Sequence, residues 1–232
     1  MKTIFQPFIA LILLVGISLY ACSPSLSPPL DAGYTYFPLE TGRFIVYDVS
    51  ETSYSLTAMP NTKTYQYKEV IGEVFKDISG IERYKIQGLK RDNTSQVWQS
   101  DSLFTALVAS DRATKTESNQ TYVKLLFPIK KGLRWNGNLL NAQGLLNYEI
   151  EETEKNIQIG GTNFTNVLII KQKNDSSAVS RDKRYEYFAQ NIGLVYKENS
   201  QVFYCYDATC LGKGKIDYGT IRIIKINSYG KN

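Results

Sequence analysis

The chain contains no histidine among its 232 residues, which restricts the chemistry that its side chains can perform. Histidine general bases, histidine-activated nucleophiles and histidine metal sites are excluded. The densest acidic cluster is Glu149, Glu151, Glu152 and Glu154. Glu149 and Glu151 would lie on one face of a strand, roughly 7 Å apart, a spacing that glycosidase carboxylates can have. Any solvated strand face shows the same pattern, so we predict no catalytic residue.

Cys22 is the first of three cysteines and closes the sequence Leu19-Tyr20-Ala21-Cys22. It follows Lys2 and an apolar run over residues 8–19, which is too short for a spanning helix of about 20 residues and suits a signal peptide. The sequence resembles the bacterial lipobox. That resemblance implies diacylglycerol on Cys22, cleavage before it, and acylation (palmitate) of the new amino group. The alternative is a secreted protein cleaved after Ala21.

The lipid bilayer is therefore the expected partner, and other envelope proteins are further candidates. We expect a signal peptide over 1–21, a Ser/Pro-rich tether over 22–33 in a semi-extended form, and one domain over 34–232. No Asp stands next to Cys22, and residues 23–30 contain no acidic run. This resembles sorting to the outer membrane, with the domain facing the periplasm.

Cys205 and Cys210 are predicted to form a disulfide, because two thiols this close would pair in an oxidising compartment. The bridge would contribute about 2 kcal/mol. A redox pair is the alternative, but the spacing is not Cys-x-x-Cys. With Cys22 lipidated, too few cysteines remain for a structural zinc site, and we expect no metal and no cofactor.

Ser102 is a candidate O-glycosylation site, because Asp101-Ser102-Leu103 resembles the three-residue sequence that some bacteria modify in the periplasm. The formal net charge is +5, and the basic residues are spread along the chain. No basic stripe with interleaved aromatic residues is present, so we expect no nucleic-acid binding.

The chain after the tether predicts an all-β fold. It has 17 tyrosines, and its short apolar runs are separated by Gly, Asn, Asp and Ser. We expect a strand over 64–76 with a bulge at Gly72, and a strand over 102–110, where a short helix is the alternative. Gly160-Gly161 is a hairpin signal. Residues 58–61 and 130–144 are expected to be loops, with Trp135 packed against a sheet edge.

A short motif occurs twice, as Phe37-Pro38-Leu39-x-x-Gly42 and as Phe127-Pro128-Ile129-x-x-Gly132. Strands and a glycine-centred hairpin follow each copy in the same order. This predicts two related β units, over 34–125 and 126–226. They would join into an antiparallel curved sheet or partial barrel. The alternative is that the motif begins a strand well in any β protein.

Three segments carry a resemblance to known proteins: Tyr36-Phe37-Pro38-Leu39-x-x-Gly42, Gly161-Thr162-Asn163-Phe164-x-Asn166-Val167-Leu168 and Tyr187-Phe188-Ala189-x-x-Ile192-Gly193-Leu194-Val195. They resemble uncharacterised bacterial envelope lipoproteins and are similar to the periplasmic β families related to DUF3108. The resemblance implies a β-rich envelope protein. Those families have no assigned catalytic residues, so none carry over.

Together these features predict a membrane-anchored lipoprotein that acts as a binding or scaffolding module, with an unknown ligand. One alternative is a histidine-free carboxylate hydrolase acting on glycans, which two facing buried carboxylates in a cleft would favour. Another is a periplasmic lipid carrier, which a continuous apolar cavity would favour. A solid core with flat aromatic patches would favour a scaffold.

Overall fold

The computed structural model describes residues 31–232. The predicted signal peptide, Cys22 and most of the tether lie outside these residues. A short 3-10 helix, η1 (Tyr34–Tyr36), precedes the strands, which are β1 (Arg43–Ser55), β2 (Ala58–Lys76), β3 (Glu82–Arg91), β4 (Gln99–Val108), β5 (Arg112–Glu117), β6 (Gln120–Leu126), β7 (Arg134–Asn136), β8 (Asn147–Ile159), β9 (Thr162–Ser176), β10 (Ser180–Ala189), β11 (Gly193–Tyr204) and β12 (Ile216–Lys231). Among the described residues, no helix has the length and apolar character that crossing a membrane requires.

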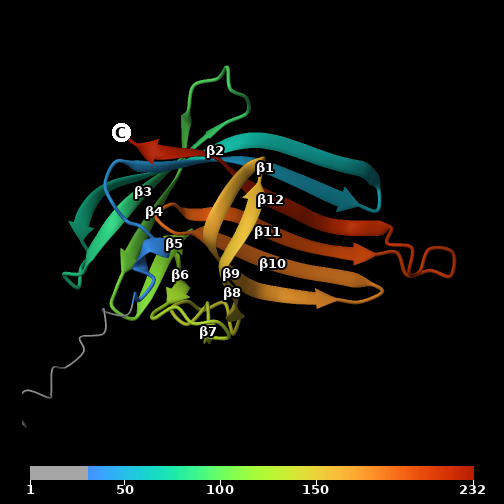
Figure 1. Cartoon of the computed structure of the whole chain (residues 1–232). Coiled ribbons are helices and arrows are strands. Elements are labelled where there is room, and N and C mark those ends of the chain that lie inside the picture. Colours follow the sequence, from blue (N-terminus) through green and yellow to red (C-terminus); the bar gives the residue numbers. More distant parts are fainter. Residues whose placement is uncertain (1–30) are drawn as a thin grey trace, which may run out of the picture. The chain divides into compact units, whose positions relative to one another are not determined.

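All twelve strands form one antiparallel sheet, in the order β6-β5-β4-β3-β2-β1-β12-β11-β10-β9-β8-β7. The chain runs outward from β1 to one edge, restarts at the other edge with β7, and returns to β12 beside β1 (Figure 1). The sheet therefore consists of two consecutive six-stranded meanders. The predicted all-β, antiparallel, curved architecture is confirmed.

The two edges of the sheet meet at a seam between β6 and the segment that contains β7. The N–H of Val123 donates to the carbonyl of Gly137 at 2.9 Å. The indole N–H of Trp135 donates to the carbonyl of Val123 at 2.8 Å. Trp135 is buried and packs edge-on against Tyr148, so the expected contact of this tryptophan with a sheet edge is confirmed. The seam makes the sheet a nearly closed barrel.

Several local predictions are confirmed. Residues 102–108 belong to β4 and are a strand rather than a helix. Gly160 and Gly161 connect β8 to β9 with φ of 57° and 87°, as a two-residue hairpin turn with left-handed residues requires. Gly72 lies in the bulge where the register between β2 and β3 shifts.

Three local predictions are wrong or incomplete. Residues 58–61 are the first residues of β2, not a loop; Pro60 is tolerated because it falls beside the register shift between Ser53 and Ser55, where no ladder bond needs its missing N–H. The segment 130–144 contains the short strand β7. No strand was expected over β5, which carries no alternation of apolar residues.

The repeated motif precedes the first strand of each meander. Gly42 and Gly132 have φ of 89° and 83°, a conformation that glycine adopts without steric cost. Each donates its N–H at 2.8 Å to a carbonyl in the second strand of its own meander, that of Ile71 in β2 and that of Ile150 in β8. Two related units would share this geometry; their common origin stays a prediction.

The core has two parts. The larger includes the seam, because Trp135 belongs to one cluster with Leu125, Ile150, Ile170 and Phe188. The smaller lies on the opposite face of the second meander, because adjacent residues of a strand point to opposite sides. There the β8–β9 hairpin packs against the sheet, and the members of this cluster are Ile159, Phe164, Val167, Ala189, Val195 and Ile226. The candidate site lies in the interior of the sheet, where residues of both meanders line a cavity.

Candidate functional site

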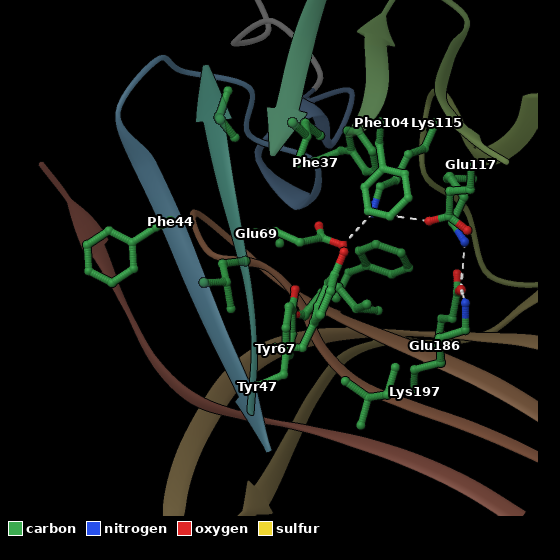
Figure 2. Close-up of a pocket in the computed structure, with 18 of the residues that line it drawn as sticks. Phe37, Phe44, Tyr47, Tyr67, Glu69, Phe104, Lys115, Glu117, Glu186 and Lys197 are labelled. Atoms are coloured by element: carbon green, nitrogen blue, oxygen red, sulfur yellow. Dashed lines mark hydrogen bonds and ion pairs between the residues drawn. The ribbon is translucent and has the colours of Figure 1, made fainter. Parts of the chain in front are cut away.

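The interior of the sheet contains a cavity of about 370 Å³. This volume is within the range of about 300–1,000 Å³ of small-molecule sites. Aromatic and aliphatic side chains form much of its wall, among them Tyr47, Ile86, Phe104 and Phe188. Both meanders contribute to the wall, which includes residues of β1 to β6 and of β10 to β12 (Figure 2).

Charged side chains enter this cavity because successive residues of a strand point to opposite faces of the sheet, and these residues occupy inward positions. Tyr67, Glu69 and Ile71 are alternate residues of β2, and all three line the cavity. Glu186 stands two residues before Phe188 on β10, and both side chains line it. The same alternation of side chains that points the apolar residues of these strands into the interior therefore points these carboxylates there as well.

Lys115 on β5 joins two carboxylates across the first meander. Its Nζ lies 2.6 Å from Glu69 Oε1 and 3.1 Å from Glu117 Oε1. Figure 2 shows Lys115 between the two acids and beside the ring of Phe104, whose centroid is 4.6 Å from Nζ. Burial opposes ionisation of Lys115, but the carboxylates of Glu69 and Glu117 outweigh it and raise its pKa. Lys115 is therefore a fixed cation.

Glu186 lies between two lysines from different strands. Its Oε1 lies 2.6 Å from Nζ of Lys124 on β6 and 3.0 Å from Nζ of Lys197 on β11. The Glu186 side chain is 0% exposed, and that of Lys197 is 27% exposed. The other carboxylate oxygen, Oε2 of Glu186, is buried without a hydrogen-bond partner. A buried charged oxygen without a donor is costly, and it belongs to a residue that lines the cavity.

Neighbouring ammonium groups favour the ionised forms of Glu186 and Glu117. Burial raises the pKa of Glu186, but the ammonium groups of Lys124 and Lys197 outweigh it and lower the pKa to about 2. Burial also opposes ionisation of Glu117, yet Lys115, Lys197 and Lys124 hold its pKa below the usual range. With Glu69, three carboxylates face three ammonium groups in one site.

The predicted modification site, Ser102, lies in the cavity wall. Its hydroxyl is 2.6 Å from the hydroxyl of Tyr67, and both residues line the cavity. Gly88 allows this pair, because a Cβ there would stand 1.9 Å from the tyrosine oxygen and 2.2 Å from the serine oxygen. Burial raises the pKa of Tyr67 to about 12, so its hydroxyl stays protonated. O-glycosylation of Ser102 stays a prediction.

The acidic cluster of β8 does not line this cavity. Glu149 pairs with Lys171 at 3.0 Å and with Arg134 at 3.1 Å, and hydrogen bonds from these two residues lower its pKa. Glu151 pairs with the same lysine at 3.2 Å. Glu152 pairs with a lysine of the β6–β7 connection at 2.8 Å. These carboxylates are paired with cations outside the cavity, as the solvated-face interpretation expects.

Cys205 and Cys210 form a disulfide in the β11–β12 connection, with their Cα atoms 5.8 Å apart. Both are buried. Asp207 lies close to both sulfur atoms, but bonded sulfurs offer no thiolate to a metal. The bridge shapes the connection and does not line the cavity.

No protein-family model matches this chain, and no curated protein matches it, so the resemblance to the DUF3108-related families is not confirmed. A crystallised protein of Bacteroides fragilis with a YmcC-like fold, inferred to be exported, aligns with a TM-score of 0.41 at 13% identity over 83% of this chain and 98% of its own. A protein of Parabacteroides distasonis, inferred to be a lipoprotein, aligns with a TM-score of 0.34 at 13% identity over 84% and 98%. Both scores are too low to assign a function.

Proposed function

We propose that this protein is a lipid-anchored binding module of the bacterial cell envelope and that the interior cavity is its ligand site. One observation carries the proposal: a cavity of ligand size contains three ion-paired carboxylates, and one of them keeps an oxygen without a donor. Replacing buried ion pairs by apolar residues is often neutral or stabilising. Stability alone therefore does not account for the charges, whereas recognition of a ligand does.

The two alternatives fit the cavity less well. A lipid carrier needs a continuous apolar surface, and an acyl chain placed here would leave the three lysines and three glutamates of the interior ion pairs against hydrocarbon. A glycoside hydrolase needs one carboxylic acid with a raised pKa to protonate the leaving group. The ammonium groups beside Glu117 and Glu186 lower the pKa of both carboxyl groups, which is the opposite of what that role requires.

The proposed location in the cell depends on the resemblance of the sequence at Cys22 to a lipobox. We assign the mature protein to the outer membrane, facing the periplasm, with the bilayer as its partner through the acyl anchor. Cys22→Ala should release the protein from membranes. Membranes from cells that make either form are washed in high salt and carbonate, and the protein is followed by immunoblotting. A variant that still sediments with washed membranes would contradict the anchor.

The binding proposal is tested by filling the cavity. Ile71→Trp places a large ring in the cavity wall, whereas Val70→Trp makes the same change at the neighbouring position of β2, which points to the other face. The detergent-solubilised lipoprotein is screened by ligand-observed NMR against sugars, amino acids, carboxylic acids and fatty acids. We expect a bound probe to be lost only with Ile71→Trp. If no probe binds, or if both variants bind as the parent does, the cavity is not the ligand site.

A further inference from the structure

The cavity contains hydrogen-bond donors and acceptors that the protein does not use fully. Each ammonium group offers three N–H donors and each carboxylate about four acceptor positions. Lys124 and Lys197 both contact the same oxygen of Glu186, while its Oε2 has no donor. Unused donors therefore lie next to an unused acceptor. A group that both donates and accepts would satisfy the two together, and a hydroxyl is such a group.

The charges of the cavity restrict the ligand further. Glu69, Glu117 and Glu186 balance Lys115, Lys124 and Lys197, so this interior ion-pair network carries no net charge before a ligand enters; Arg43, Asp101 and Arg222 line the wall outside the network. A cation at Oε2 would place a third positive charge on Glu186. An anion beside Lys197 would also approach the carboxylate of Glu186, 3.0 Å from Nζ, and would share the cavity with Glu117. An uncharged ligand avoids the cost of an unbalanced buried charge.

We propose that the cavity binds a neutral, hydroxyl-rich molecule of the sugar or polyol class; this inference rests on the proposed function. One ligand hydroxyl donates to Oε2 of Glu186 and accepts from the ammonium group of Lys197. The hydroxyls of Tyr67 and Ser102 offer a second polar contact. Phe104 and Phe188 contact the carbon skeleton, as apolar walls of mixed sites do.

Lys197 is the residue that gives a ligand access to Glu186. Its Nζ lies 3.0 Å from Glu186 Oε1, whereas Nζ of Lys124 lies 2.6 Å from the same oxygen. The side chain of Lys197 is 27% exposed, and that of Lys124 is 8% exposed. It is thus the less tightly held of the two cations. When its side chain turns toward the ligand, Glu186 keeps its ion pair with Lys124 and Oε2 becomes reachable.

Sugars that share one ring but differ in charge test the neutral-ligand step. Glucose, glucuronate and glucosamine, with the corresponding galactose series, are titrated into the solubilised lipoprotein and followed by NMR and calorimetry. We expect at least one neutral sugar to bind. Its charged analogues should bind with an affinity at least about tenfold lower, since an unpaired buried charge costs more than 1.4 kcal/mol.

Two matched lysine variants test the assigned contact. Lys197→Met keeps the aliphatic stem, removes the ammonium group and leaves Glu186 paired with Lys124. Lys171→Met removes an ammonium group of similar exposure (29%) that bridges Glu149 and Glu151 away from the cavity. Loss of a hydrogen bond to a charged group should weaken sugar binding about tenfold or more in Lys197→Met. Lys171→Met should bind as the parent does.

The outcomes separate the inference from the proposed function. If a charged sugar, an amino acid or a fatty acid binds in the cavity and no neutral sugar does, the inference is wrong and the binding module stands. If a neutral sugar binds equally to the parent and to Lys197→Met, the assigned contact is wrong. If no probe of any class binds, the proposed function fails and the inference fails with it.

Discussion

Lys124→Met should be among the most destabilising single substitutions at the cavity. The Lys124 side chain is 8% exposed and lies 2.6 Å from a carboxylate that is 0% exposed. Methionine fills the space of the aliphatic stem and removes only the ammonium group. Glu186 is then left with Lys197, at 3.0 Å, as its one remaining cation.

Two arguments give the size of the effect. Removing one partner of a buried ion pair costs about 3–5 kcal/mol, because the other charge stays buried without compensation. The fall of the Glu186 pKa from 4.5 to about 2 corresponds to about 3 kcal/mol of stabilisation of its charged form. Since Lys197 still compensates in part, we expect the free energy of unfolding to fall by about 3 kcal/mol.

The dependence on pH identifies the cause. The folded-state pKa of Glu186 lies below its unfolded value, so its contribution to stability is present above about pH 4.5 and is lost as the pH falls toward about 2. Protonated Glu186 no longer needs a cation. The difference in unfolding free energy between the parent and Lys124→Met should therefore shrink over that window.

Urea unfolding, followed by tryptophan fluorescence at several pH values, measures this difference. Lys171→Met is the control, because its ion pairs with Glu149 and Glu151 lie outside the cavity and remain partly open to solvent, where such pairs contribute about 0–1 kcal/mol. A loss below about 1 kcal/mol at neutral pH would show that Glu186 is not held by Lys124. A difference that stays constant down to about pH 3 would show that the loss comes from packing and not from charge.

The remaining predictions concern the seam, the cavity wall and the disulfide. Trp135→Phe removes the indole donor to the β6 carbonyl; this should cost about 1–3 kcal/mol and speed amide exchange in β6 and β7, and unchanged exchange would contradict the seam. Gly88→Ala puts a Cβ 1.9 Å from the hydroxyl oxygen of Tyr67 and should lower the free energy of unfolding in urea by about 1–3 kcal/mol. Gly72→Ala is its control and should lower it less, because a Cβ there stands 3.5 Å from its nearest neighbour. Replacing Cys205 and Cys210 by Ser should lower stability by about 2 kcal/mol without affecting sugar binding; loss of binding would show that the bridge shapes the cavity.

The sequence predicts the architecture well where apolar residues alternate and where glycines mark turns. The Gly160-Gly161 hairpin and the strand at Ser102 are of this kind. It fails for β5, whose residues Arg-Ala-Thr-Lys-Thr-Glu have no apolar alternation, although Ala113, Thr114 and Lys115 are all buried. This strand is formed because its neighbours β4 and β6 supply its hydrogen bonds. Tertiary pairing overrides local preference there.

The cavity charges were missed because their partners are distant in sequence. Lys115 and Glu69 are 46 residues apart, and Lys124 and Glu186 are 62 apart. A signal was nevertheless present. Glu69 stands between the apolar residues Tyr67 and Ile71 on one face of a predicted strand. A charge at an inward position requires a partner, but alternation alone cannot say which strand supplies it.

The ion pairs of the cavity form two groups, and these groups connect different parts of the sheet. Glu69, Lys115 and Glu117 all belong to the first meander, whereas the pair Lys124–Glu186 joins β6 of the first meander to β10 of the second. The second group therefore contributes to closure of the sheet beside the Trp135 seam as well as lining the cavity. A ligand that supplies the missing donor to Glu186 binds the closed form better than an open one, so it should stabilise the closed sheet. Slower amide exchange in β6 and β7 on addition of a bound sugar would then accompany binding, and exchange that changes only in β2 and β5 would place the ligand at the other group.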